Sequence, residues 1–230
     1  ATLTRSHPGL IYCSVTGFGQ DGPYAPRPAY DFIIQGMSGL MSTCGDAAGP
    51  PMRTSIPLTD LATGLYTTVA LLGALLHRRT TGEGQVIDMA LLDAAVAFNG
   101  HLAQGYLMGA PVPHRAGNTN PIASPSEVFA CADGPLIVAA GNDAQFVALC
   151  DVLGLSELAR DPCFSTNAER IRRRDELRAA LAPALAGFTR ADLAARLDAA
   201  NVPGGPIHDM AGVFNDAQVR HRGLAASAGA

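Results

Sequence analysis

The sequence contains no lysine, because all 16 of its basic residues are arginine. Schiff-base catalysis, anchoring of pyridoxal phosphate and the P-loop each need a lysine, so these classes of protein are excluded. Cysteine is scarce as well, with five scattered residues and no C-x-x-C pair. Neither a disulfide framework nor a zinc site is indicated, and we expect a reducing, cytoplasmic setting.

Positive charge is also in short supply. The net charge is -4 and the isoelectric point is near 5.8, whereas a general nucleic-acid binder needs a positive surface. The six histidines are scattered, and none stand at the i, i+4 spacing of a helical metal pair, so we expect no metal site. Small molecules or other proteins, rather than nucleic acid, are the expected partners.

A membrane-spanning run is not expected either. The apolar part of the longest expected helix, Leu61 to Leu76, contains Thr and Gly and is shorter than the roughly 20 residues that span a bilayer. It predicts a buried core helix. The chain begins with Ala1 and no signal-like run precedes its first strand-like segment. We expect it to be either processed or part of a longer polypeptide.

What is present is enough apolar sequence for a full core, since 48% of the 230 residues are hydrophobic. In the first part, the periodicity predicts strands over 9–15 and 85–90, and helices over 30–41, 55–79 and 91–109. Ser55 is the expected N-cap of the helix over 55–79, with Pro57 in its first turn.

The second part begins with a predicted hairpin over 126–141 that turns at Asp133-Gly134. Helices are expected over 143–155, 167–188 and 190–201, with Asp143 and Thr189 as N-caps. The arginines between 170 and 174 stand among acidic residues and indicate a solvated helix face. Together the patterns predict a mixed α/β (α+β) fold with a helix-rich segment over 1–112, a smaller α+β domain over 113–224 and a tail over 225–230.

One carboxylate stands out, because Asp60 is the only acidic residue of the helix expected over 55–79. An aspartate in the first turn of a helix commonly satisfies free N–H groups and the positive end of the dipole. The same environment keeps the carboxylate ionised and directs it out of the helix end, as a carboxylate nucleophile requires. Helix physics alone leaves both interpretations open.

Three ordered stretches resemble the family III CoA-transferases. They are "YCSVTGFGQDGPYAPRPAYDFIIQGMSGLMS" (12–42), "PLTDLATGLYTTVALLGALLHRRTTGEGQVIDMALLDAAVA" (57–97) and "AGNTNPIASPSEVFACADGPLIVAAGNDAQF" (116–146). The resemblance runs from about residue 8 to about residue 224. It implies the central part of that family's fold, without the N-terminal Rossmann-like half that supplies much of the CoA nucleotide site.

The resemblance implies a transfer of CoA from an acyl-CoA thioester to a free carboxylic acid. The family's nucleophile matches Asp60, which would form an acyl-aspartyl anhydride and then an aspartyl-CoA thioester. CoA would enter as a substrate rather than as a permanently bound cofactor. The implied CoA contacts are Arg27, Pro28, Ala29, Tyr30 and Asp31, and the implied substrate-loop residues are Gly17, Gly19, Asn118 and Asn120. The family also implies an interlocked homodimer.

Two alternatives stay open. The related α-methylacyl-CoA racemases carry a histidine where this chain has Tyr30, and a tyrosine with its ordinary pKa near 10 is a poor base at neutral pH. Asp143 matches their second acid/base position, although we expect it to act as an N-cap. The second alternative is a non-catalytic fragment or subunit that needs a separate nucleotide-binding half. The acyl group, the acceptor acid and the pathway are not predicted.

Overall fold

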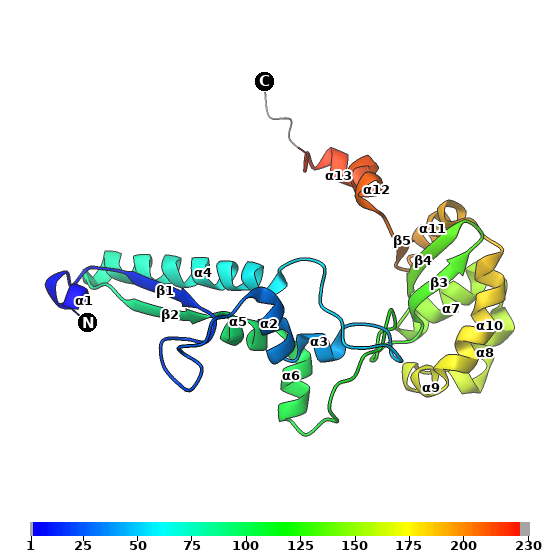
Figure 1. Cartoon of the computed structure of the whole chain (residues 1–230). Coiled ribbons are helices and arrows are strands. Elements are labelled where there is room, and N and C mark those ends of the chain that lie inside the picture. Colours follow the sequence, from blue (N-terminus) through cyan, green and yellow to red (C-terminus); the bar gives the residue numbers. More distant parts are fainter. Residues whose placement is uncertain (1, 226–230) are drawn as a thin grey trace. The chain divides into compact units, whose positions relative to one another are not determined.

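The computed structural model describes residues 2–225. Their contacts divide the chain into two compact units, one up to Gly117 and one from Asn118 onward. The predicted boundary after residue 112 lies in the same connecting segment, and the assignment of two separate domains stays a prediction. Of the predicted tail, only residue 225 is described; the rest lies outside the described residues. The mixed α/β fold class is confirmed (Figure 1).

The first unit has a small parallel sheet and one long helix that runs along it. Its elements are α1 (Thr2–Ser6), β1 (Tyr12–Thr16), α2 (Asp31–Met37), α3 (Leu40–Thr43), α4 (Leu58–Thr81), β2 (Val86–Ala90), α5 (Leu91–Phe98) and α6 (Gly100–Leu107). β1 and β2 pair in parallel, from Tyr12 opposite Val86 to Thr16 opposite Ala90. A parallel pair needs a crossover connection, and α4 supplies it (Figure 1). Because α4 runs back along the strands, its N-terminus lies at their carboxyl ends.

Two helices predicted in this unit are broken by local backbone geometry. The helix expected over 30–41 is interrupted by Gly39, whose φ of 89° is left-handed. The helix expected over 91–109 is interrupted between Asn99 and Gly100, whose φ of 51° is left-handed. The Asn99 side-chain amide donates to the carbonyl of Ser38 at 2.8 Å. The prediction that Ser55 caps α4 is wrong, because the helix begins at Leu58 with Pro57 in the N-cap position.

The burial of α4 also differs from the prediction of a core helix. Its buried residues are Thr59, Ala62, Thr63 and Ala74. Most of its large apolar side chains are exposed in the described chain, and Leu65 is 69% exposed. By length and composition α4 is able to cross a membrane, a test that core helices of soluble proteins also pass. The absence of a membrane segment therefore stays a prediction.

The second unit is an antiparallel sheet with a cluster of helices. Its elements are β3 (Ser126–Cys131), β4 (Gly134–Ala139), α7 (Asp143–Val152), α8 (Ser156–Arg160), the 3-10 helix η1 (Pro162–Phe164), α9 (Asn167–Arg172), α10 (Arg174–Ala186), α11 (Arg190–Ala199), β5 (Gly204–Pro206), α12 (Met210–Asn215) and α13 (Ala217–His221). The strands lie in the order β3-β4-β5. The predicted hairpin is confirmed, with Cys131 opposite Gly134 at its turn. Leucines from α10 and α11 pack on Phe129, Leu136 and Phe146 to form the core.

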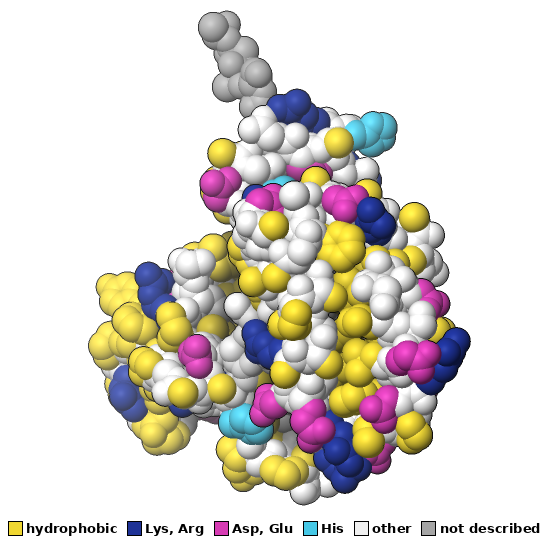
Figure 2. Space-filling view, turned by 90° about the vertical axis from the view of Figure 1, so that its right-hand side faces the viewer, with side chains coloured by type: hydrophobic (Ala, Val, Ile, Leu, Met, Phe, Trp, Pro, Cys, Tyr) yellow, Lys and Arg dark blue, Asp and Glu magenta, His cyan; other side chains and the backbone are white. Residues whose placement is uncertain are grey.

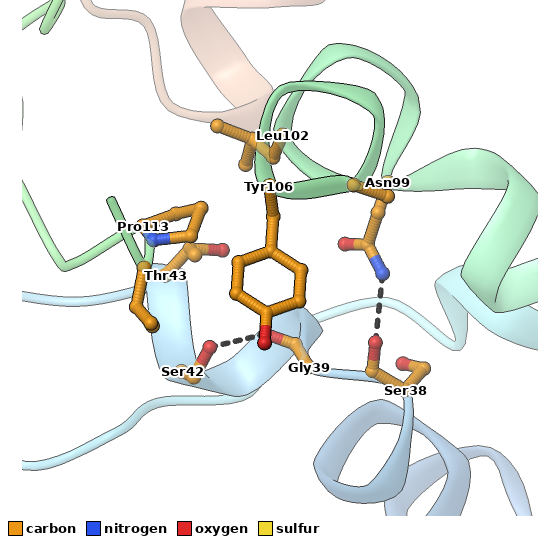
Figure 3. Close-up of a pocket in the computed structure, with 10 residues that line it drawn as sticks. Ser38, Gly39, Ser42, Thr43, Asn99, Leu102, Tyr106 and Pro113 are labelled. Atoms are coloured by element: carbon orange, nitrogen blue, oxygen red, sulfur yellow. Dashed lines mark hydrogen bonds between the residues drawn. The ribbon is translucent and has the colours of Figure 1, made fainter. Parts of the chain in front are cut away.

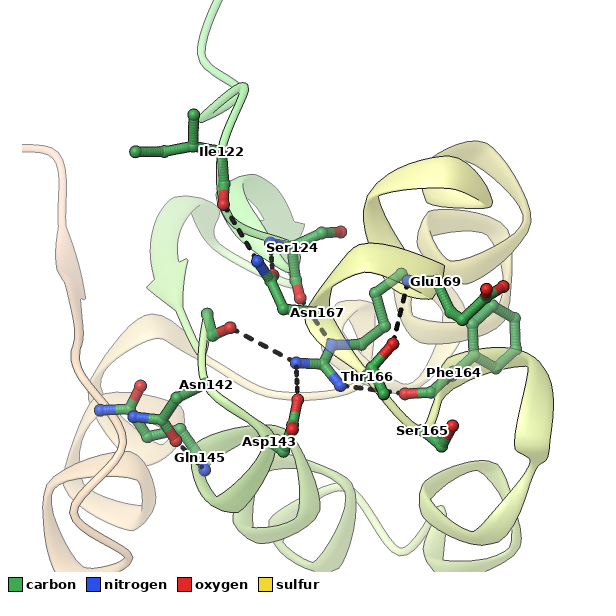
Figure 4. Close-up of polar contacts among 12 residues, drawn as sticks. Ile122, Ser124, Asn142, Asp143, Gln145, Phe164, Ser165, Thr166, Asn167 and Glu169 are labelled. Carbon is green, nitrogen blue, oxygen red and sulfur yellow. Dashed lines mark hydrogen bonds and ion pairs between the residues drawn. The ribbon is translucent and has the colours of Figure 1, made fainter. Parts of the chain in front are cut away.

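Arg170 corrects the prediction that the basic run is a solvated face. Its side chain is fully buried, donates to the carbonyls of Ser124 and Phe164 at 2.8 and 2.9 Å, and pairs with Asp143 at 2.8 Å (Figure 4). The later arginines of the run follow the prediction better, since Arg172 pairs with Glu169 at the surface. Acidic and basic side chains lie beside one another on the face seen in Figure 2.

The predicted caps of this unit have mixed outcomes. Thr189 is confirmed as the N-cap of α11, because its hydroxyl accepts a hydrogen bond from the amide of Asp192. The prediction for Asp143 is wrong, since Asn142 caps α7 by accepting from the amide of Gln145 at 2.8 Å. Asp143 is the first helical residue instead, and one oxygen of its carboxylate forms an ion pair with Arg170.

Candidate active site

Asp60 lies where the two parallel strands end. It is the third residue of α4, and it lines an open hollow of about 300 Å³ together with Val15, Thr63, Gly64, Thr67 and Leu91. Val15 comes from the end of β1 and Leu91 directly follows β2, so the sheet edge forms one wall and the first turns of α4 form the other. The carboxyl end of a parallel sheet is where ligands of open α/β folds bind.

Gly64 leaves this hollow open along the helix. It stands one turn after Asp60, and a Cβ atom built on it would meet nothing within 4 Å. The backbone of α4 is therefore accessible beside the Asp60 carboxylate, where any larger residue would cover it. A ligand group can lie along the helix next to Asp60 without displacing a side chain.

The Asp60 carboxylate is exposed and accepts none of the hydrogen bonds, and joins none of the ion pairs, found among residues 2–225. Partial loss of hydration in the hollow, and secondly the negative charge of Asp31, raise the pKa of Asp60 above its ordinary value. An ionised carboxylate with raised basicity and no hydrogen-bonded partner is a better nucleophile than one that accepts hydrogen bonds from the amides at a helix N-terminus.

Asp31, predicted as a CoA contact, lies beside Asp60, and both oxygens of its carboxylate accept hydrogen bonds. One carboxylate oxygen accepts from the amide and the hydroxyl of Thr59 at 2.9 and 2.7 Å. The other accepts from the side-chain amide of Gln35 at 2.7 Å. Burial by itself would raise the pKa of Asp31, but the hydrogen bonds from Thr59 and Gln35 outweigh it and hold the pKa below the ordinary value.

Tyr30, Ala29 and the glycines of the loop after β1 are gathered in the same unit. Tyr30 precedes α2 and is 77% exposed. A Cβ on Gly17 would lie 2.3 Å from the Cβ of Ala29, so only glycine allows the loop to pack there. Gly19 has a left-handed φ of 92°, and its amide donates to the hydroxyl of Thr16 at 2.9 Å. These contacts explain both glycines structurally, and a ligand role for them stays a prediction.

Arg27 and Pro28 are exposed on the same loop. The Arg27 guanidinium lies over the ring of Tyr24 at 4.4 Å and near the ring of Phe18 at 5.6 Å. The two rings are themselves in edge contact at 5.4 Å. The loop thus holds one cation on an aromatic surface, where it remains accessible to an anion such as a phosphate.

Asn118 and Asn120 belong to the second unit, whereas Asp60 belongs to the first. The side-chain oxygen of Asn120 accepts from the amide of Ile122 at 3.0 Å, which is an Asx-turn. Its backbone carbonyl accepts from Arg174 at 2.6 Å. Both contacts belong to the turn that leads into β3, and a substrate role for the two asparagines stays a prediction.

A second hollow of about 300 Å³ in the first unit lies away from these residues. The ring of Tyr106 reaches from α6 toward Gly39 and Ser42, and Asn99 and Pro113 complete the walls (Figure 3). Its lining residues include no carboxylate, imidazole or thiol. It therefore offers hydroxyl groups but no carboxylate or imidazole base to activate them, and Asp60 remains the candidate for chemistry.

Sequence reasoning missed Gln35 and Thr59. Gln35 is fully buried, and its side-chain oxygen accepts from the amide of Thr54 at 2.9 Å. The only signal in the sequence is that Asp31 and Gln35 stand four residues apart and so share one face of a helix. Thr59 is distant from both in the sequence, and nothing in its own neighbourhood indicates the contact.

Comparison with known proteins places this geometry in a family. The model of CoA-transferase family III matches residues 1–229. A succinate–glutarate CoA-transferase of Agrobacterium fabrum is 44% identical over 97% of this chain, which spans 56% of that protein. An acetyl-CoA:oxalate CoA-transferase of Acetobacter aceti is 40% identical over 99% of the chain, which spans 59% of it. The chain thus spans somewhat over half the length of these relatives.

Solved structures agree with this. A CaiB/BaiF family protein from Brucella suis has a TM-score of 0.83 and 43% identity, covering 97% of this chain and 59% of its own. A Mycobacterium tuberculosis protein has a TM-score of 0.85 at 27% identity, covering 96% of this chain and 58% of its own. The protein class is therefore that of the CaiB/BaiF fold. The chain belongs to CoA-transferase family III.

Proposed function

We propose that this protein transfers CoA from an acyl-CoA thioester to a free carboxylic acid, with Asp60 as the nucleophile. The observation that carries the proposal is the unpartnered carboxylate of Asp60 in an open hollow at the carboxyl ends of β1 and β2. Family membership and the names of the relatives support the reaction class. The helix-cap interpretation of Asp60 is less well supported, because Asp31 accepts the hydrogen bond from the amide of Thr59.

The reaction proceeds by four acyl exchanges on one carboxylate. An Asp60 oxygen attacks the thioester carbon, the C–S bond breaks, and the CoA thiolate leaves an acyl-aspartyl anhydride. The thiolate attacks the aspartyl carbonyl, which releases the donor acid and forms an aspartyl-CoA thioester. The acceptor carboxylate displaces the thiolate to give a second anhydride. The thiolate then attacks the acceptor's acyl carbon, so that the new thioester leaves and the Asp60 carboxylate is restored.

The proposed acids are short dicarboxylic acids. The relatives named above act on succinate and glutarate or on oxalate, and a further relative from Haloarcula marismortui, 32% identical, is a succinyl-CoA:mesaconate CoA-transferase. CoA is a substrate in this scheme, and no electron transfer step requires a redox cofactor. Succinyl-CoA with glutarate is therefore the first substrate pair to test.

The test uses the protein expressed from its complete gene, with succinyl-CoA and glutarate, and follows glutaryl-CoA by chromatography. Asp60→Asn keeps the size of the side chain and removes the nucleophile, so exchange should fall by on the order of 1000-fold or more. Asp93→Asn is the matched control, because Asp93 is an exposed first-turn aspartate of α5, and it should keep nearly full activity.

Retained exchange in Asp60→Asn with an intact fold would overturn the proposed nucleophile. Exchange that starts only after a second polypeptide is added would support the accessory-subunit alternative instead. Exchange with another acid but not glutarate would keep the nucleophile and change the substrate class.

A racemase is less well supported by the geometry. Asp143, which matches the racemases' second acid/base position, pairs at 2.8 Å with the fully buried guanidinium of Arg170. This ion pair gives one oxygen of Asp143 a structural partner within the second unit. Deuterium uptake at the α-carbon of an acyl-CoA without any acceptor acid would reverse this preference.

We also propose that the working protein is a cytoplasmic homodimer. The exposed apolar residues of α4 require a covering surface, which a second subunit or further polypeptide of the complete protein would supply; they are Leu61, Leu65, Tyr66, Val69, Leu72, Leu75 and Leu76. All five cysteines are free, in keeping with a reducing compartment. Sedimentation equilibrium should give twice the chain mass, and a monomer at micromolar concentration would contradict the assembly.

A further inference from the structure

Helix α4 lacks a side-chain cap of its own. Its N-cap residue, Pro57, forms no capping hydrogen bond, yet the first amides of a helix need acceptors. Asp31, at the start of α2, supplies one across 28 residues of sequence, where it accepts from both the amide and the hydroxyl of Thr59 at 2.9 and 2.7 Å. Asp31 therefore supplies a hydrogen-bonded negative charge at the positive end of the α4 dipole.

Gln35 fixes the orientation of Asp31. Its side-chain oxygen accepts from the amide and the hydroxyl of Thr54, at 2.9 and 3.2 Å. The amide nitrogen of Gln35 must consequently face the other way, where it donates to Asp31 at 2.7 Å and to the carbonyl of Ile56 at 3.4 Å. Because Gln35 is fully buried, breaking one of these bonds would leave an unsatisfied polar group.

The hydrogen bonds of Asp31 and Gln35 therefore fix the residues before Asp60 at two places. Thr54 and Ile56 are held by Gln35, and Thr59 is held by Asp31. Thr59 also accepts, through its carbonyl, the hydroxyl hydrogen of Thr63 at 2.7 Å, which continues the ordered segment into the wall of the hollow. Each of these contacts stops short of the Asp60 carboxylate, which remains without a donor.

We infer that Asp31 is a positioning residue for Asp60. Its carboxylate takes the amide that opens α4, fixes the direction of the first turn and leaves the oxygens of Asp60 unshared for attack on a thioester carbon. The inference rests on the proposed role of Asp60. It also gives Asp31 a different task from the CoA contact that the sequence resemblance implies, because both of its oxygens are already occupied by Thr59 and Gln35.

The test compares two variants in the protein expressed from its complete gene. Asp31→Asn keeps one oxygen for Thr59 but removes the charge and places an amide against the amide of Gln35. We expect kcat to fall by roughly 10- to 100-fold, because small misplacement of a reacting group has effects of this size. KM for the acyl-CoA should change by less than about threefold, since the substrate contacts are kept.

The second variant is the exchange Asp31→Asn with Gln35→Glu. It restores an amide-to-carboxylate hydrogen bond between positions 31 and 35, keeps acceptors for Thr54 and Thr59, and returns the charge. It should recover at least about tenfold in kcat relative to Asp31→Asn alone. A purely structural cap would be restored in stability without this recovery of kcat, and that result would overturn the inference.

The labelling of Asp60 separates the inference from the proposed function. In the unchanged protein, acyl-CoA followed by hydroxylamine should convert Asp60 to a hydroxamate, and Asp31→Asn should slow the labelling by the same factor as kcat. Labelling at an unchanged rate in Asp31→Asn would overturn only the role of Asp31, as would a raised KM with normal kcat, which would indicate a CoA contact. No label in the unchanged protein would overturn the role of Asp60 itself.

Discussion

The two units of the chain hold themselves together in different ways. In the second unit, leucines and phenylalanines from the sheet and from α7, α10 and α11 form a closed hydrophobic core. In the first unit the buried hydrophobic residues are Ile34 and five alanines (Ala62, Ala74, Ala90, Ala94 and Ala95). Large apolar side chains of α4 face outward instead, as Leu65 and Val69 do, each 69% exposed.

The two units also differ in how the N-termini of their helices are capped. In the second unit, α7, α9 and α11 are capped by their own N-cap side chains, Asn142, Thr166 and Thr189. In the first unit, none of the described N-caps of α2 to α6 forms a side-chain capping bond, and α4 is capped by the distant Asp31. Several helices of the second unit thus have local caps and the unit has a core of its own, whereas the candidate site is held by long-range polar contacts.

The largest expected effect on stability comes from Arg170 in the second unit. Arg170→Met keeps the bulk of the side chain but leaves Asp143 and three carbonyls without their donor. The free energy of unfolding should fall by roughly 3 to 5 kcal/mol, because buried carbonyls are left without a donor. Urea denaturation with far-UV circular dichroism measures this loss. Arg172→Met on the same helix removes an exposed ion pair and should cost about 1 kcal/mol or less. Equal losses in the two variants would show that the buried contacts add nothing.

A pair of leucines tests whether the two cores are independent. Leu181→Ala in the closed core, where the side chain is fully buried, should cost roughly 2 to 5 kcal/mol and speed amide exchange throughout β3 and β4. Leu72→Ala, on the exposed side of α4, should leave exchange in β3 and β4 unchanged. Hydrogen-exchange mass spectrometry separates the peptides, and faster exchange of β3 in Leu72→Ala would break the distinction between the units.

The first unit should also carry the acid sensitivity of the reaction. Asp60 attacks only when ionised, and its pKa is raised by lost hydration and by Asp31, so the rate should begin to fall at a higher pH than an ordinary aspartate would give. Below that pKa the rate should drop about tenfold per pH unit. Asp31→Asn removes the neighbouring negative charge, and the acid limb of kcat/KM should move to lower pH. An unmoved limb would show that Asp31 does not act on Asp60 electrostatically.

Asp31 itself titrates with the opposite sign. Its folded-state pKa is lowered, so the stability it contributes is present above its unfolded pKa and is lost as the pH falls through the folded value. The first unit should therefore loosen at strongly acid pH through Asp31, below the range in which Asp60 protonation already stops the reaction. Exchange rates of peptides from α2 and α4, followed against pH, measure this separately from activity.

The smallest expected effect is that of a local cap. Thr189→Ala removes the hydroxyl that accepts from Asp192 and should cost about 1 kcal/mol, whereas Thr189→Ser keeps the acceptor and should cost only a few tenths. Urea denaturation compares the two. A loss as large in the serine variant would mean that the methyl group, rather than the cap, stabilises α11.

These differences explain which features were predictable from the sequence. The hairpin of β3 and β4 and the cap at Thr189 depend on neighbouring residues, and both predictions are confirmed. The strand β5 was missed, because Gly204–Pro206 has little strand propensity and forms only by pairing with β4. The burial of Arg170 was missed for the same reason, since its partners Ser124, Gly141 and Asp143 come from distant segments.

In the candidate site, too, contacts between residues that are distant in the sequence could not be predicted. The position of Asp60 in the first turn of a long helix follows from the sequence pattern, and the structure agrees. Its freedom from hydrogen bonds does not follow, because that depends on Asp31 reaching Thr59 from another helix. The exposure of α4 was not predicted either, since periodicity records which residues are apolar but not what covers them.

The most direct test of the central claim is chemical trapping at Asp60. The protein expressed from its complete gene is incubated with succinyl-CoA, treated with hydroxylamine and digested, and the peptide that contains Asp60 is sequenced by mass spectrometry. The account predicts a hydroxamate on Asp60, absent without succinyl-CoA and absent from other carboxylates such as Asp93. An active protein with no modification of Asp60, or with the label on another residue, would contradict it.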